Sequence, residues 1–433
     1  MHKLSLSAAL AGLLGLANAF PNLPFTTDGP NIVDSNGKVV KVAGTNWPGH
    51  NDAMIPEGLQ YKSVKDVVDD IKSLGMNVIR LTYAIEMIDQ IYEGGGRDVT
   101  IETALSDALG ETLGAQVLAE ILERNPQFTS QTTRLEASCG FQPQCARAIT
   151  CFLFVFDAVV DELNAQEIYV NLDNHISRGE WCCGGTDGNT WWGDQYFNAD
   201  NWVRGLGYMA KHGTKWNNLM SMSLRNELRQ PQNNSTLLAT YNWQNWYPNM
   251  QRGARAVHDA NPRPLVVLSG LNYDTTMQPI VRGYALDPGS QTFVPEEFAP
   301  GYADKLVIEL HNYQNSISSC ADLQGSLYNG GAQAMNPDDS STKNVFPVLV
   351  TEFGFDQTDY QSVYSTCLAS WLPGNTAGWM SWVIVGSYYM RQGTADYDET
   401  WGLYNHNWSA WRSEAYVKEL LIPSIEQTLA GNS

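Results

Sequence analysis

Short apolar runs alternate along the chain with longer segments in which apolar residues recur every three or four positions. The short runs predict buried strands of a parallel sheet, and the longer segments, such as residues 64–74, predict the helices that cover it. The expected strands are residues 39–47, 77–81, 168–173, 219–224, 265–269, 306–310, 348–351 and 379–383. Eight strands separated by helical segments predict an α/β fold, a (β/α)8 TIM barrel.

A doubly wound open sheet is the structural alternative, but its phosphate loop is missing. The G-x-G-x-x-A match at residues 205–210 falls within a helical pattern and follows no strand. Residues 84–166 are too long for a simple crossover, so we expect loop insertions after the second and third strands. The sequence contains no G-x-S-x-G or Walker A motif, no repeats and no linker tract, which predicts one domain over residues 20–433.

Residues 1–19 combine Lys3 with an apolar stretch and end in Ala-Asn-Ala, which predicts a secretory signal peptide too short to span a membrane. We therefore expect an extracellular protein. Its seven cysteines then predict up to three disulfides and one remaining thiol, with the pairing left open. A metal site made of His175, Cys182 and Cys183 is the less favoured alternative.

The formal net charge of −20 and the absence of a basic run exclude nucleic acid and anionic membranes as partners. Uncharged ligands remain. The 14 tryptophans include several in polar, glycine-rich stretches, where a role in the core explains them poorly and sugar rings can stack on them. Asn-x-Ser/Thr acceptors at Asn233, Asn234 and Asn407 predict surface positions open to glycosylation.

Polar side chains follow most of the predicted strands, and two of them are glutamates. Each glutamate alone is explained as a cap of the next helix. The whole set favours one site, because the carboxyl ends of barrel strands meet at one face. The set, in strand order, is Arg80, His175, Asn226 with Glu227, His311 with Tyr313, Glu352 and Trp382.

These residues resemble those of glycoside hydrolase family 5, and the resemblance runs from about Gly44 to Trp382. It implies a nucleophile at Glu352 and an acid/base at Glu227. It further implies that Asn226 binds the sugar 2-hydroxyl, that Arg80 and Tyr313 support Glu352, that His175 and His311 line the subsite and that Trp382 forms its floor. Leu228 stands where most members have proline, so Asn-Glu-Leu resembles a branch shared by plants and fungi.

The chemistry of glycoside cleavage agrees with two glutamates. Carboxylates about 5–5.5 Å apart permit a covalent intermediate and retention, whereas about 6.5–9.5 Å admits a water and gives inversion. The resemblance implies the shorter spacing. We expect repulsion between the acids to raise the pKa of one and Arg80 to lower the pKa of Glu352.

The sequence therefore predicts a monomeric, secreted retaining glycoside hydrolase, acting on β-linked polysaccharides or oligosaccharides without a cofactor or metal. Among the possible activities, we favour an endo-β-1,4-glucanase over a β-1,4-mannanase and an exo-acting β-glucosidase. A non-catalytic glycan-binding barrel would be expected to lose one of the two acids, and a metal-dependent hydrolase would need a motif such as H-E-x-x-H, which is absent. We also expect four tryptophans to contact substrate: Trp47, Trp181, Trp191 and Trp192.

Overall fold

A closed barrel of eight parallel strands forms the centre of the computed structural model, which describes residues 22–135 and 154–432. The strands follow one another round the ring in chain order, and β11 closes it against both β10 and β4. This confirms the predicted barrel and its eight strands. They are β4 (Val42–Trp47), β5 (Val78–Ala84), β6 (Tyr169–Ile176), β7 (Leu219–Ser223), β8 (Leu265–Leu268), β9 (Leu306–Asn312), β10 (Val348–Phe353) and β11 (Gly378–Ser381).

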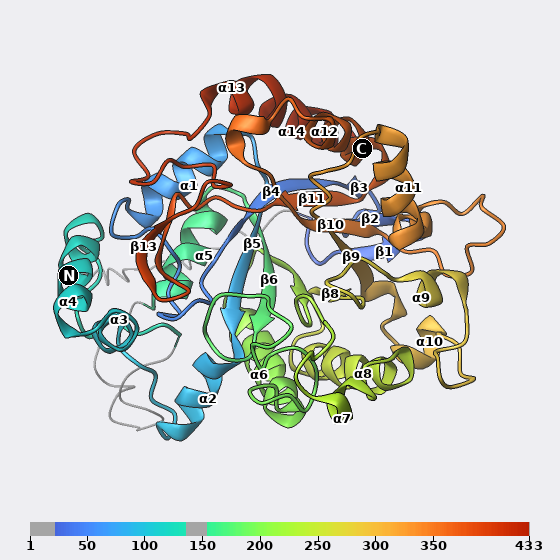
Figure 1. The fold of residues 1–433 in the computed structure, drawn as a ribbon, viewed down its shortest axis with the longest axis horizontal. Coiled ribbons are helices and arrows are strands. Elements are labelled where there is room, and N and C mark those ends of the chain that lie inside the picture. The colour runs from blue at the N-terminus through green and yellow to red at the C-terminus, as the bar shows by residue number, and fades with distance from the viewer. Residues whose placement is uncertain (1–21, 136–153, 433) are drawn as a thin grey trace, which may run out of the picture.

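Helices surround the strands on the outside (Figure 1). Polar caps mark several of their starts. The Ser63 side chain accepts from the Asp66 N–H at α1, and the Asn198 side chain does the same for two N–H groups at α6. The helices are α1 (Val64–Ser73), α2 (Ile85–Glu93), α3 (Ile101–Leu109), α4 (Glu111–Arg124), α5 (Val155–Ala165), α6 (Ala199–His212), α7 (Ser235–Leu238), α8 (Trp243–Ala260), α9 (Gln278–Arg282), α10 (Pro295–Phe298), α11 (Cys320–Gly330), α12 (Val363–Asn375), α13 (Glu414–Tyr416) and α14 (Ile422–Leu429).

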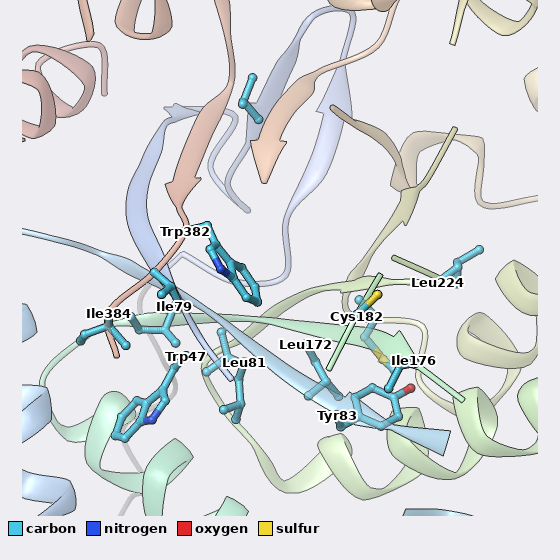
Figure 2. Close-up of a cluster of buried hydrophobic side chains, with 14 of the residues drawn as sticks. Trp47, Ile79, Leu81, Tyr83, Leu172, Ile176, Cys182, Leu224, Trp382 and Ile384 are labelled. Carbon is cyan, nitrogen blue, oxygen red and sulfur yellow. The ribbon is translucent and has the colours of Figure 1, made fainter. Parts of the chain in front are cut away.

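The register of the barrel fixes which side chains face its interior. Asn46 on β4 pairs with Arg80 on β5, and Arg80 pairs with Asn171 on β6. Side chains alternate between the two faces of a strand, so Trp47, next to Asn46, points outward. Trp47 lies in the outer core with Leu81 and Ile384, completely buried (Figure 2).

A small antiparallel sheet at the start of the described chain packs on the amino-terminal end of the barrel. Its strands are β1 (Thr26–Asp28), β2 (Asn31–Val33) and β3 (Val39–Val40). Phe25 and Ile32 pack there in one apolar cluster with Val42 and Val78 from the barrel strands. This covered end leaves the opposite, carboxyl-terminal end for a site.

The predicted insertion after the second barrel strand is present as α2 to α5, of which α3 and α4 pack against each other away from the barrel (Figure 1). The third strand is followed by a long loop, residues 177–198, before α6. We did not predict the hairpin of β12 (Ser387–Arg391) and β13 (Thr394–Asp398) after β11.

Some predictions lie outside the described residues, namely the signal peptide at residues 1–19 and Cys139, Cys145 and Cys151. Among the helices of residues 22–135 and 154–432, none combines the length and the apolar character that crossing a membrane requires.

Candidate active site

A cavity of about 740 Å³ lies at the carboxyl-terminal end of the barrel. This volume falls within the range of small-molecule sites in proteins. The strand ends contribute six of the predicted residues to its wall: His175, Glu227, His311, Tyr313, Glu352 and Trp382. The structure therefore brings together side chains that are up to 207 positions apart in the chain.

Glu352 is the last residue but one of β10 and is 4% exposed. One carboxylate oxygen accepts from Arg80 Nη1 at 2.6 Å, and the other accepts from the Tyr313 hydroxyl at 2.8 Å. Both oxygens are thus held in place by strong donors, one of them charged. Burial nevertheless raises the pKa of Glu352, although the charge of Arg80 acts to lower it. Arg80 acts in the expected direction, but the loss of water on burial has the larger effect, so the pKa of Glu352 as a whole is raised.

Arg80 connects most of the polar groups beneath the cavity. Its Nη1 also donates to Asn46 Oδ1 at 3.0 Å, and its Nη2 donates to Asn226 Oδ1 at 2.9 Å and lies 3.1 Å from Asp173 Oδ1. Burial disfavours the charged guanidinium, but the surrounding carboxylates of Asp173 and Glu352 outweigh burial and raise its pKa. Arg80 therefore stays charged and fixes the amide of Asn226 as well as Glu352.

Glu227 follows β7 in a left-handed backbone conformation, with φ of 48°. Such a conformation is uncommon for a residue with a side chain and is held by its surroundings. Here the Glu227 N–H donates to Asp274 Oδ2 at 2.8 Å. The conformation directs the carboxyl group to His311 Nδ1, 2.9 Å from Glu227 Oε1.

The protonation of His311 follows from its hydrogen-bond chain. The Thr351 hydroxyl donates to Glu309 Oε2 at 2.9 Å, so its oxygen must accept from His311 Nε2, 3.0 Å away. Burial lowers the pKa of His311, which favours the neutral ring. In a neutral ring with the proton on Nε2, Nδ1 is an acceptor. The network thus favours a protonated Glu227 that donates to His311.

The same conclusion follows from the pKa of Glu227, which burial raises from 4.5 to about 7. The two glutamates differ in their partners. Glu352 faces Arg80, whereas Glu227 faces a neutral imidazole. One carboxylate oxygen of Glu227 lies within 4.8 Å of one of Glu352.

Trp382 follows β11, and its indole stacks on His175 with ring centroids 5.3 Å apart. His175 is fixed by a hydrogen bond of 2.7 Å between its Nδ1 and Asp173 Oδ2. Burial lowers the pKa of His175 well below its usual value, so the ring is neutral. Its ring centroid also lies 3.9 Å from that of His50. The floor of the cavity is thus an uncharged aromatic surface, suited to the apolar face of a ring.

Cys182 and Cys183 form a disulfide that lines the cavity, and Cys320 pairs with Cys367. These pairings confirm that disulfides form. The alternative metal site with His175 is therefore wrong, because bonded sulfurs are not thiolate ligands. Asn226 Nδ2 lies 3.5 Å from the Cys183 sulfur, so the disulfide packs against the amide that Arg80 holds.

Three of the predicted substrate-binding tryptophans do not line the cavity. Trp47 faces outward from β4 because of the register described above, and its Nε1 donates to Glu57 O. Trp191 and Trp192 are 1% and 6% exposed. Their rings lie in an aromatic cluster, with Trp191 against Tyr241 and Trp192 against Trp202. Only Trp181 of the four lines the cavity.

The predicted acceptors Asn233, Asn234 and Asn407 are exposed. Glycosylation itself stays a prediction. Asn234 already caps α7 by accepting from the Leu237 N–H.

Sequence reasoning missed several acids around the site. Asp173 and Glu309 lie two positions before His175 and His311 on the same strands, and Asp274 lies in the loop after β8. The period of two along a strand places Asp173 and Glu309 on the same face as the histidines, which is a usable signal. Asp274 carries no such signal.

Comparison with known proteins gives one family. Residues 146–387 match the family model described as cellulase (glycosyl hydrolase family 5). A glycosyl hydrolase 5 family protein of Chamaecyparis obtusa is 33% identical over 426 residues, covering 95% of this chain and 68% of the relative. An endoglucanase of Paenibacillus polymyxa is 20% identical, covering 89% of this chain and 84% of the relative.

Solved structures with the same fold include a complex of an endocellulase variant from Pyrococcus horikoshii with cellotetraose. The TM-score is 0.64 at 16% identity, and the alignment covers 92% of this chain and 99% of the other.

Proposed function

Because the chain belongs to glycosyl hydrolase family 5 and is a glycoside hydrolase, we propose that it cleaves internal β-1,4 bonds of glucans with retention of configuration. Glu352 acts as the nucleophile and Glu227 as the acid/base. We further infer that residues 20–433 form one catalytic domain, which acts outside the cell as a monomer.

The observation that carries the proposal is the pairing of two nearby carboxyl groups in unequal surroundings. Oxygens of Glu227 and Glu352 lie within 4.8 Å of each other. This supports a short spacing, at which one carboxylate attacks the sugar directly and no water fits between them. Arg80 and Tyr313 orient Glu352 for that attack.

The reaction then follows from the hydrogen bonds. In the first step protonated Glu227 gives its proton to the departing sugar oxygen, while Glu352 attacks the anomeric carbon. Asn226 binds the 2-hydroxyl; this is supported by the hydrogen bond from Arg80 to its Oδ1 and by its Nδ2, which lies 3.4 Å from His175 Nε2. In the second step Glu227 takes a proton from water, which attacks the glycosyl-enzyme.

Relatives support glucan as the substrate, since the one from Paenibacillus polymyxa is named an endoglucanase. The test is a panel of soluble cellulose, mannan and aryl glycosides, with viscosity and reducing ends followed together. We expect viscosity of the cellulose derivative to fall before many reducing ends appear. Cleavage of mannan alone, or release of single sugars at constant viscosity, would contradict the proposal.

Rescue with azide distinguishes the role of Glu227 from that of Glu352. Glu227→Ala should still form the glycosyl-enzyme from a dinitrophenyl glycoside, because that leaving group departs without acid, and azide should restore turnover and give the β-azide. Glu352→Ala should give the α-azide or no product, and Glu352→Gln should lose nearly all turnover. Equal loss on all substrates with no response to azide would remove Glu227 from the acid/base role.

A further inference from the structure

A disulfide between neighbouring residues lies in the wall of the cavity. Cys182 and Cys183 are adjacent in the chain, so their bond closes a small ring through a single peptide unit. Both side chains line the cavity, from the loop between β6 and α6. The chemistry described above gives this disulfide no task.

Stabilisation of the chain does not explain a bridge of this kind. A disulfide stabilises a fold mainly by restricting the unfolded chain, and the restriction grows with the length of the closed loop. Cys320 and Cys367 lie 47 positions apart and cross-link α11 to α12. Only that bridge restricts a long loop, so the bridge between Cys182 and Cys183 acts locally.

The side-chain amide of Asn226 contacts both sulfurs of the bridge. Its Nδ2 lies 3.7 Å from the Cys182 sulfur and 3.5 Å from the Cys183 sulfur. The same Nδ2 is 3.4 Å from His175 Nε2. At the other end of the amide, Oδ1 accepts from the Arg80 guanidinium at 2.9 Å. The amide is thus held at one end by a charged donor and bounded at the other by the disulfide.

The bridge borders the N–H groups of Asn226 without competing for them. Sulfur is a weak hydrogen-bond acceptor, and a disulfide carries no charge. The contacts of Asn226 Nδ2, at 3.4 to 3.7 Å, are all longer than an ordinary N–H···O bond of about 2.9 Å. A sugar hydroxyl at the ordinary distance therefore binds the amide more strongly than these neighbours do.

Reduction changes both the shape and the charge of this border. A thiol reductant breaks the S–S bond and supplies two electrons and two protons, which leaves two S–H groups while the reductant becomes a disulfide. The bonded sulfurs, about 2 Å apart, then separate, because unbonded atoms need a longer distance. A thiol also ionises, and a thiolate is a charged acceptor that competes for the Asn226 N–H groups. That charge would lie within 4.8 Å of a carboxylate oxygen of Glu227.

The chain after the bridge is tied to the same two residues from a second direction. Gly184 O accepts from Arg229 Nε at 2.8 Å, and Arg229 Nη1 donates to Glu227 O at 2.9 Å. A shift of the two cysteines therefore reaches the backbone beside Asn226 as well as its side chain.

We propose that the Cys182–Cys183 disulfide is a positioning element of the active site, which holds the Asn226 amide for the 2-hydroxyl of the sugar under attack. Reduction by a thiol releases the amide and lowers activity. This proposal rests on the function proposed above, in which Asn226 binds that hydroxyl. The bridge acts through Asn226 rather than on the reacting bond.

The experiment measures what the 2-hydroxyl contributes with and without the bridge. The substrates are a dinitrophenyl β-cellobioside and its analogue that lacks the hydroxyl at C2 of the sugar bonded to the leaving group. The measured quantity is the ratio of kcat/KM for the first substrate to that for the second. In Cys182→Ala/Cys183→Ala this ratio should fall by about 10- to 100-fold, as for a lost hydrogen bond that strengthens in the transition state.

Two controls separate positioning from stability. Cys320→Ala/Cys367→Ala removes the long-range bridge and should lower the melting temperature while the ratio stays at its wild-type value. Dithiothreitol should lower the ratio in the wild type, and reoxidation should restore it. The same treatment should leave the ratio of Cys182→Ala/Cys183→Ala unchanged, which attributes the effect to this bridge.

An unchanged ratio in Cys182→Ala/Cys183→Ala would overturn the proposal. An equal loss on both substrates would overturn it as well, because the bridge would then only keep the loop folded. Where that variant unfolds, the reduced wild type retains every side chain and provides the same comparison, and an unchanged ratio there has the same meaning.

Asn226→Ala shows whether the bridge acts through the amide. Alone it should lower the ratio, and combined with Cys182→Ala/Cys183→Ala it should lower the ratio no further. A further fall in the combined variant would contradict the proposed route. Failure of the proposed function is recognised separately, since Asn226→Ala would then leave the ratio at its wild-type value.

Discussion

Replacing Thr351 with valine tests whether the hydrogen-bond chain keeps Glu227 protonated. Valine has nearly the shape of threonine but cannot accept from His311 Nε2 or donate to Glu309. Without that acceptor, the proton of the neutral ring is free to move to Nδ1, where it donates to Glu227 and stabilises the carboxylate. The pKa of Glu227 should fall.

The expected change in the pKa of Glu227 can be worked out from the single hydrogen bond between His311 and Thr351. A neutral hydrogen bond contributes about 0.5–1.5 kcal/mol, and one pKa unit corresponds to about 1.36 kcal/mol. The loss of the Thr351 bond should therefore lower the pKa of Glu227 by about 0.4 to 1 unit from its value of about 7. Since the first step needs protonated Glu227, activity should begin to fall at a correspondingly lower pH.

The assay is the pH profile of kcat/KM on an oligosaccharide, whose poor leaving group requires the acid. The control is Thr376→Val, a second fully buried threonine whose hydroxyl donates to Leu372 O away from the cavity. The control should leave both limbs of the profile unchanged. An alkaline limb that stays at its wild-type pH in Thr351→Val, or moves upward, would refute the assignment of the proton to His311 Nε2.

Three further outcomes are expected. In the wild type, the alkaline limb of kcat/KM should lie near pH 7, because burial raises the pKa of Glu227 to about 7 and the acid is lost above it; a limb above pH 9 would contradict this. Tyr313→Phe should lower kcat/KM by about 10- to 100-fold and move the acidic limb to higher pH, because the hydroxyl that lowers the pKa of Glu352 is gone; an unmoved limb would argue against that contact. Trp192→Ala should reduce the free energy of unfolding in urea by about 3–5 kcal/mol, whereas Trp181→Ala should chiefly raise KM; the reverse pattern would contradict their placement.

Much of the barrel and the centre of the site could be predicted because strand ends are local features. Apolar runs gave the eight strands, and the polar residue after each run gave Arg80, His175 and Glu352. The face on which Trp47 lies could not be predicted from its strand alone. One position along a strand reverses the face, and only the pairing of Asn46 with Arg80 decides it.

The rest depends on loops, whose course is set by contacts distant in sequence. Trp191 and Trp192 look like surface aromatics in a glycine-rich segment, but Tyr241 packs against the first and Trp202 of α6 against the second. The β12–β13 hairpin had one local signal. Gln392 and Gly393 at its turn have φ of 51° and 80°, as in the tight turns that favour glycine. Strand β13 alternates Ala395 and Tyr397 with polar residues, but none of its residues is buried, so the pattern is too short and too weak to predict the strand.

The closure of β11 on β4 has a consequence for the time course of synthesis. The two strands are about 330 residues apart, which at 5–20 residues per second takes on the order of 20–60 s of translation. During that interval one edge of β4 lacks its final neighbour, and an apolar unpaired edge is where chains associate wrongly. Trp382 follows the closing strand, so the nascent chain acquires the floor of its cavity and the last barrel contact together.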